Sequence, residues 1–94
     1  MKKTILITND DGITSPGLKA LKNSLTGLGK IITVAPERDN SAVSHSITMG
    51  RPLKIKQLGQ DEYCVDGTPT DCVVLAIEKI VGAKPDLLLS GINN

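Results

Sequence analysis

The sequence predicts an α/β fold, a three-layer Rossmann-like sheet that is mostly parallel and carries one β-hairpin excursion. Runs of leucine and β-branched residues at positions 5–7, 31–34 and 87–89 are typical of strands buried on both faces. Helical patterns alternate with these runs, and strand, helix, strand in that order makes a right-handed parallel unit. The length of 94 residues predicts a single domain over residues 1–94.

The first unit is expected to join a strand at residues 4–8 to a strand at residues 31–35 through a helix at residues 16–28. Ser15 stands before the helix as a capping residue, and Pro16 fits its first turn, where no backbone donor is needed. Leucines then recur at helical spacing with lysines on the other side. Two glycines near residue 28 are expected to end the helix.

The second half of the chain is expected to leave the sheet and return to it. Residues 47–58 and 62–65 predict an antiparallel pair that forms a basic, solvated edge. Residues 67–71 carry helix-capping chemistry, which predicts a structural role for them and a helix at residues 69–81. Because that helix is apolar nearly all round, we expect burial on more than one side. A third buried strand is expected near residues 86–90.

Charge and composition argue against nucleic-acid polymers and membranes as partners. The 11 basic and 10 acidic residues give a formal charge of +1, and Tyr63 is the single aromatic residue. Neither a basic field nor a stacking platform is therefore present. The sequence shows no signal peptide or membrane-spanning run, which predicts a cytoplasmic protein. Cys64 and Cys72 lack the paired spacing of zinc or thioredoxin sites, so we expect them to be reduced and structural.

Polar loops follow the three predicted parallel strands, at residues 9–12, 39–46 and 90–94. Ligands of open parallel sheets bind beyond the carboxyl ends of the strands, so the three loops should face one crevice. They hold carboxylates, hydroxyls and amides, with His45 as their one imidazole and no cysteine. Oxygen donors of this kind favour one hard divalent cation per chain, Mg²⁺, Mn²⁺ or Ca²⁺.

The adjacent carboxylates of Asp10 and Asp11 stand at the end of the first strand, directly before Gly12. Side by side they repel each other unless a cation or hydrogen-bond donors lie between them. A cation held there would lower the pKa of its water and stabilise charge on a phosphoryl oxygen, which is the chemistry of metal-assisted hydrolysis. The simpler interpretation is a solvated Asn-Asp-Asp-Gly turn.

Other protein classes also place a functional motif after the first strand. Receiver domains bind Mg²⁺ with an acidic pair, but they need an aspartate at the end of the third strand, where residues 87–91 supply none. Haloacid-dehalogenase phosphatases use Asp-x-Asp, and dinucleotide sites need Gly-x-Gly-x-x-Gly, which residues 12–17 do not match. A receiver-like, Mg²⁺-binding regulatory domain and an inactive fragment that only self-associates are kept as alternatives.

Four segments carry a more specific signal through their order and spacing. They are Ile7-Thr8-Asn9-Asp10-Asp11-Gly12 with Ser15-Pro16-Gly17, Val34-Ala35-Pro36-Glu37-Arg38 with Asn40, Ser41, Ser44, Ser46 and Thr48, then Gly67-Thr68-Pro69-Thr70-Asp71-Cys72-Val73, and Ser90-Gly91-Ile92-Asn93. In this pattern the whole chain resembles the N-terminal part of the SurE survival proteins, a family of metal-dependent nucleoside monophosphate phosphatases.

The resemblance implies a 5'-nucleotidase that hydrolyses phosphate monoesters of nucleoside monophosphates by a metal-activated water. By the same resemblance Asp10 and Asp11 are catalytic, and they share the metal with Ser41 and Asn93. Candidate substrate contacts in the same loops are Asn9, Asn40, His45 and Asn94.

Members of this family continue well beyond the length of this chain. Their further elements include a Ser-Gly-Thr segment with a phosphate-binding role and C-terminal elements through which they associate as homo-oligomers. The resemblance therefore implies an incomplete N-terminal fragment of a protein that is a dimer or tetramer at full length. Alone, such a fragment is expected to be inactive and to self-associate through an uncovered sheet edge.

Overall fold

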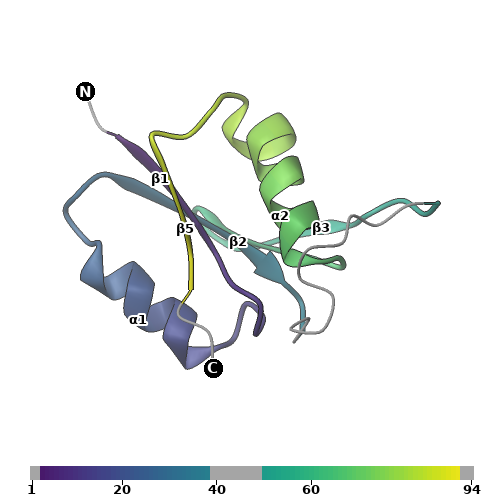
Figure 1. The fold of residues 1–94 in the computed structure, drawn as a ribbon, viewed down its shortest axis with the longest axis horizontal. Helices are drawn as coiled ribbons and strands as arrows, with labels where there is room; N and C mark the ends of the chain where they lie inside the picture. Colours follow the sequence, from purple (N-terminus) through teal and green to yellow (C-terminus); the bar gives the residue numbers. More distant parts are fainter. Residues whose placement is uncertain (1–2, 39–49, 92–94) are drawn as a thin grey trace.

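One mixed sheet forms the centre of the fold in the computed structural model, which describes residues 3–38 and 50–91 (Figure 1). Its five described strands follow the order β3-β4-β2-β1-β5, and every neighbouring pair is parallel except β3 and β4. The elements are β1 Thr4–Thr8, α1 Pro16–Ser24, β2 Lys30–Pro36, β3 Ile55–Gly59, β4 Glu62–Val65, α2 Pro69–Leu75, the π-helical segment η2 Ala76–Val81, and β5 Leu87–Ser90.

The three strands expected from the sequence lie side by side and run parallel, as predicted. β1 is between β2 and β5, and Leu6 at its middle faces Ile32 on one side and Leu88 on the other. A strand with neighbours on both edges and helices on both faces exposes almost nothing to water, which is why its aliphatic run is continuous. The predicted α/β class with a mostly parallel sheet is confirmed.

The two helices cover opposite faces of the sheet and so give the three predicted layers (Figure 1). Ile5 and Ile7 of β1 belong to one buried cluster with Leu18 of α1. Leu6, between them, belongs to the other cluster with Cys72 of α2. Because successive side chains of a strand point to opposite faces, one short run of β1 anchors both helices.

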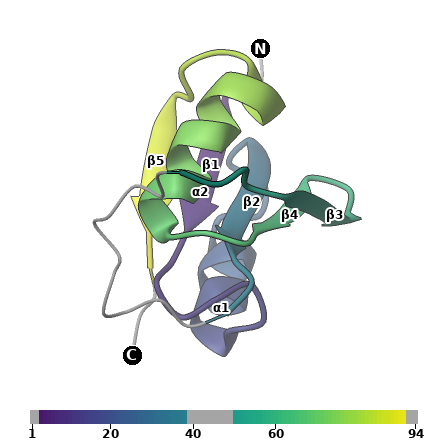
Figure 2. The same cartoon turned by 90° about the vertical axis from the view of Figure 1, so that its right-hand side faces the viewer.

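β4 is the predicted strand over residues 62–65 and pairs antiparallel with β3 as expected, but its parallel pairing with a second neighbour was not predicted. It pairs with β2, so the hairpin extends the sheet sideways and β3 is its exposed edge (Figure 2). The predicted strand over residues 47–58 begins only at Ile55, and residues 47–49 lie outside the described residues. The Asp66 side chain holds the backbone directly before β3, because its carboxylate accepts a hydrogen bond from the Lys54 N–H at 2.6 Å.

The first helix begins as predicted and ends earlier. The Ser15 hydroxyl accepts a hydrogen bond from the backbone N–H of Leu18. α1 ends at Ser24 because the next two amides, those of Leu25 and Thr26, donate to carbonyls three residues back, a tighter turn than the α-helix. Leu28, the last residue of the helix predicted over residues 16–28, therefore lies beyond α1 and is 64% exposed.

The second helix carries the predicted reciprocal cap. The Thr68 hydroxyl accepts from the Asp71 N–H at 3.1 Å, and the Asp71 carboxylate accepts from the Thr68 N–H at 2.8 Å. α2 passes into η2, which ends at Gly82 with φ 76°. Burial on more than one side is not found in the described residues, since Val74 is 40% exposed and the packed face is the one against the sheet. None of the helices in residues 3–38 and 50–91 is long and apolar enough to cross a membrane.

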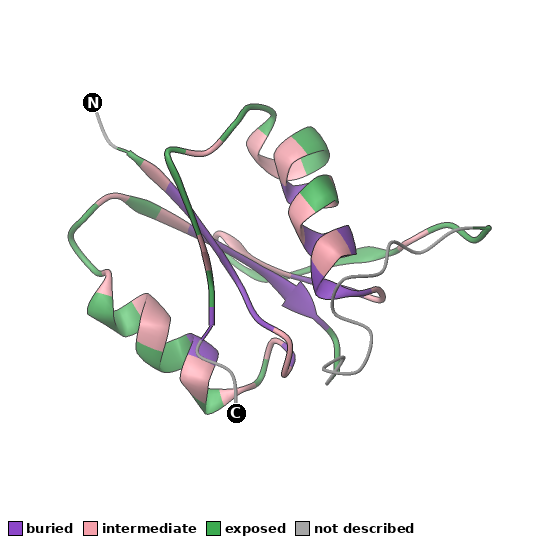
Figure 3. Cartoon of the chain, in the orientation of Figure 1, coloured by how far each residue is buried: buried purple, intermediate pink, exposed green. Residues whose placement is uncertain are grey.

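β5 was expected to be buried and is instead an exposed edge strand. Its leucines Leu87 and Leu88 are 45% and 44% exposed, and the burial colouring of Figure 3 shows the contrast with β1. The physical reason is that β1 is its one strand neighbour within the described part of the chain. An aliphatic run predicts a strand well, but it does not show whether both edges of that strand are covered.

Candidate functional site

The acidic turn after β1 is closed by the side chain of Asn9. The Gly12 N–H donates to Asn9 Oδ1 at 3.1 Å, and Asn9 Nδ2 donates to the Gly12 carbonyl at 3.1 Å. Asn9 is fully buried, and both of its polar groups bond to Gly12, so it holds the turn; its predicted contact with substrate stays a prediction. The half-buried Asp10 and Asp11 lie between these two anchor points.

Gly12 is required by both its conformation and its surroundings. Its φ of 108° lies in a region that side chains other than glycine rarely adopt. An added Cβ would also lie 3.1 Å from the carbonyl carbon of Arg38, so the turn packs closely on the segment that leaves β2. The next residue, Ile13, donates its N–H to the Pro36 carbonyl at 2.8 Å. The acidic turn and the end of β2 are therefore neighbours, as the sequence predicted.

The third predicted loop begins at the same edge of the sheet. Thr8 pairs with Ser90 in the register of β1 and β5, and the Gly91 N–H donates to the Thr8 carbonyl at 2.9 Å. The structure thus brings together the acidic turn, the end of β2 that precedes the second loop, and the start of the third loop. The remaining predicted site residues lie outside the described residues and stay predictions: Asn40, Ser41, His45, Asn93 and Asn94.

The donor chemistry of the acidic turn fits a hard divalent cation. Asp10 and Asp11 supply two carboxylates, and the Thr8 hydroxyl directly before the turn is buried without a hydrogen-bond partner among the described residues. Within residues 3–38 and 50–91, no three His, Cys, Asp or Glu side chains are grouped so that they could hold a metal. The predicted ligands Ser41 and Asn93 would add neutral oxygen donors to these carboxylates.

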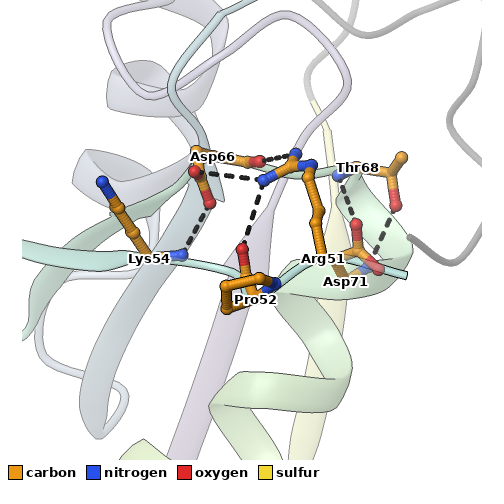
Figure 4. Close-up of polar contacts among 6 residues, drawn as sticks. All are labelled: Arg51, Pro52, Lys54, Asp66, Thr68 and Asp71. Carbon is orange, nitrogen blue, oxygen red and sulfur yellow. Dashed lines mark hydrogen bonds and ion pairs between the residues drawn. The ribbon is translucent and has the colours of Figure 1, made fainter. Parts of the chain in front are cut away.

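A second polar cluster, which sequence reasoning missed, lies where β4 ends. Arg51 donates through Nη1 to Asp66 Oδ2 at 3.2 Å and through Nη2 to the Asp66 carbonyl (Figure 4). The hydrogen bond from the Lys54 backbone, together with Arg51, holds the pKa of the Asp66 carboxyl below its usual value. Arg51 was interpreted as part of a solvated edge. Asp66 would have been a signal for it only if β4 had been recognised as a parallel strand, because an acidic residue directly after such a strand lies at the ligand-binding edge.

Beside this cluster is a cavity of about 440 Å³ at the carboxyl ends of β2 and β4. Its lining comes from the exit of β2, from the segment before β3, and from the β4–α2 junction: Glu37, Arg38, Arg51, Val65, Asp66, Gly67 and Thr68. Arg38 also borders the acidic turn through its contact with Gly12. The cavity and the acidic pair therefore share one wall.

Both cysteines are free and buried, which agrees with the predicted structural role. Burial raises the pKa of the Cys72 thiol to about 12, and burial is also the main cause that raises the pKa of Cys64. A thiol with so high a pKa is protonated near neutral pH and is a poor nucleophile. Neither cysteine is placed to attack a substrate.

The family model described as Survival protein SurE matches residues 5–94 of this chain. The chain belongs to the SurE family. The resemblance found in the four sequence segments is thereby confirmed over nearly the whole length.

Similar SurE proteins support this assignment in sequence and in structure. Two curated relatives with the name 5'-nucleotidase SurE, from Geotalea daltonii and Syntrophotalea carbinolica, are 49% and 51% identical over 95% of the chain. The crystal structure of the SurE protein from Aquifex aeolicus is similar with a TM-score of 0.91 and 51% identity over 96% of the chain. The chain spans 36% of the length of both curated relatives and 37% of the Aquifex chain.

Replacing Asn9 by Ala is expected to destabilise the fold by about 1–3 kcal/mol, because the buried Gly12 N–H then loses its acceptor. The free energy of unfolding from urea denaturation of the 94-residue chain measures this change. Asn23→Ala, on the exposed surface of α1, is the matched control and should leave stability nearly unchanged. Equal effects of the two substitutions would show that the Asn9–Gly12 contact does not hold the turn.

Proposed function

We propose that this chain is part of a 5'-nucleotidase that hydrolyses phosphate monoesters of nucleoside monophosphates with the help of one divalent cation. The observation that carries the proposal is the acidic turn, with Asp10 and Asp11 at the carboxyl edge of a parallel sheet and Asn9 closing the turn beneath them. Membership of the SurE family and the name of its curated relatives support the same activity.

In the proposed site Asp10 and Asp11 hold the cation, and Ser41 and Asn93 complete its protein ligands. A bound divalent cation would supply a water of lowered pKa and would stabilise negative charge on the phosphoryl group. The contribution of the chain is to fix the two carboxylates in advance, through the Asn9–Gly12 contacts and the packing of Gly12 on Arg38. A turn that is already ordered loses little conformational entropy when the cation and the substrate bind.

Phosphate release from a nucleoside monophosphate, measured with and without Mn²⁺, tests the proposed function. The assay uses the family-length enzyme, meaning this chain continued to the length of its curated relatives. We expect hydrolysis after Mn²⁺ is added to protein that has been stripped with EDTA, and none in the stripped protein. A protein that binds Mn²⁺ and releases no phosphate would contradict the proposed hydrolysis and favour a metal-binding regulatory role.

A further inference from the structure

The cavity at the ends of β2 and β4 has a preformed shape. One wall is the junction between β4 and α2, which the buried reciprocal cap of Thr68 and Asp71 fixes. At Gly67 a side chain is excluded, since an added Cβ would lie 2.5 Å from Asp71 Oδ2 and 2.9 Å from Leu53 Cδ2. The volume of about 440 Å³ lies in the range of about 300–1,000 Å³ that small-molecule sites occupy.

The charges of the lining balance each other. Two arginines, Arg38 and Arg51, stand with two acids, Glu37 and Asp66, and Arg51 is joined directly to Asp66 (Figure 4). A site for a bare phosphate would be expected to carry an excess of positive charge. A balanced set of guanidinium donors and carboxylate acceptors instead suits a neutral polar group that both donates and accepts hydrogen bonds.

The cavity lies next to the acidic turn. The Pro36–Arg38 backbone separates the two, and it contacts the turn at Gly12 and at Ile13. A ligand that occupied both places would have a neutral polar body in the cavity and an anionic group beyond Arg38, at the acidic turn. A nucleoside monophosphate has this construction, and the plane of an arginine guanidinium can stack on its base where aromatic side chains are lacking.

We propose that the cavity lined by Arg51, Asp66 and Glu37 binds the nucleoside part of the substrate and directs its phosphate to the acidic turn. This inference rests on the proposed nucleotidase function. It assigns recognition of the sugar and base to the ends of β2 and β4, and it separates that recognition from the phosphoryl chemistry at Asp10 and Asp11.

The test compares two substrates of the family-length enzyme, a nucleoside monophosphate and p-nitrophenyl phosphate, which has no sugar or base. Arg51→Met keeps the apolar stem and removes the guanidinium. We expect the KM for the nucleotide to rise at least about tenfold, the loss typical of one charge-assisted contact, while the kinetics with p-nitrophenyl phosphate stay unchanged. Lys54→Met is the matched control, because Lys54 is exposed and is not among the lining residues. It should alter neither substrate.

A second variant keeps the test decisive if Arg51→Met fails to fold, as judged by circular dichroism. Glu37→Gln replaces an exposed lining carboxylate by a side chain of the same shape, and it should raise the KM for the nucleotide alone. An unchanged nucleotide KM in the folded variants, or an equal rise for both substrates, would overturn the nucleoside subsite and leave the nucleotidase intact. A parent enzyme that hydrolyses neither substrate would overturn the proposed function and the subsite with it.

Discussion

Replacing Asp10 by Asn should lower nucleotide hydrolysis by the family-length enzyme by a factor on the order of 10²–10³, the loss seen when one preorganised electrostatic partner of a transition state is removed. The substitution keeps the shape of the side chain and removes one of the two charges that would hold the cation. Asp11→Asn should have an effect of the same order for the same reason. The measurement is kcat/KM for a nucleoside monophosphate at saturating Mn²⁺.

Two controls separate loss of a metal ligand from general damage. Ser41→Ala should cost less than either aspartate substitution, because water can replace a neutral ligand. Asp61→Asn removes a carboxylate at the opposite end of β4, where its ion pair with Lys30 is long at 4.0 Å, and it should leave the rate unchanged. If Asp10→Asn hydrolysed nucleotide at the parent rate with the same metal dependence, the assignment of the acidic turn would be wrong.

The 94-residue chain alone is expected to show little or no phosphatase activity, even with metal added. Catalysis requires fixed donors that hold the phosphoryl group in line with the attacking water, and a misplaced or missing set costs several orders of magnitude. The chain spans about 36% of the length of its curated relatives, and we expect some of these donors to lie in the remaining length. The exposed leucines of β5 should in addition favour self-association.

The comparison is phosphate release by the purified chain and by the family-length enzyme at equal molarity. Circular dichroism confirms that the chain is folded, and light scattering reports its association state. A substitution of Leu88 by Lys should reduce association, since a charged residue on an edge strand opposes strand pairing. Comparable hydrolysis rates for the two proteins would contradict the prediction and would place the complete active site within these residues.

Local sequence patterns predicted the centre of this fold well, because its elements depend on interactions between residues close together in the chain. The aliphatic run of β1, the Ser15 cap and the reciprocal cap of Thr68 and Asp71 each depend on residues close together in the chain. The parallel pairing of β4 with β2 was missed because strand neighbours are chosen by tertiary packing, and a four-residue strand carries little periodicity. The exposure of Leu87 and Leu88 was missed for the same reason.

The candidate site was predictable to a similar extent. Asp10 and Asp11 could be singled out because two adjacent carboxylates at the end of a buried strand are unusual. That the Asn9 side chain closes the turn, and that Arg51 meets Asp66 beside a cavity, depends on contacts across the fold. The spacing of residues along the chain does not encode such contacts. Arg51 and Asp66 are 15 positions apart in sequence and meet only after β3 and β4 have paired.

Binding of Mn²⁺, followed through the loss of the free-ion signal in electron paramagnetic resonance, tests the central claim most directly. The family-length enzyme should bind one ion per chain, and the double variant Asp10→Asn, Asp11→Asn should lose that binding while it stays folded. Hydrolysis of a nucleoside monophosphate should rise in proportion to the bound ion. Equal Mn²⁺ binding by the parent and the double variant, or full hydrolysis with no ion bound, would contradict the assignment of Asp10 and Asp11 as the metal site.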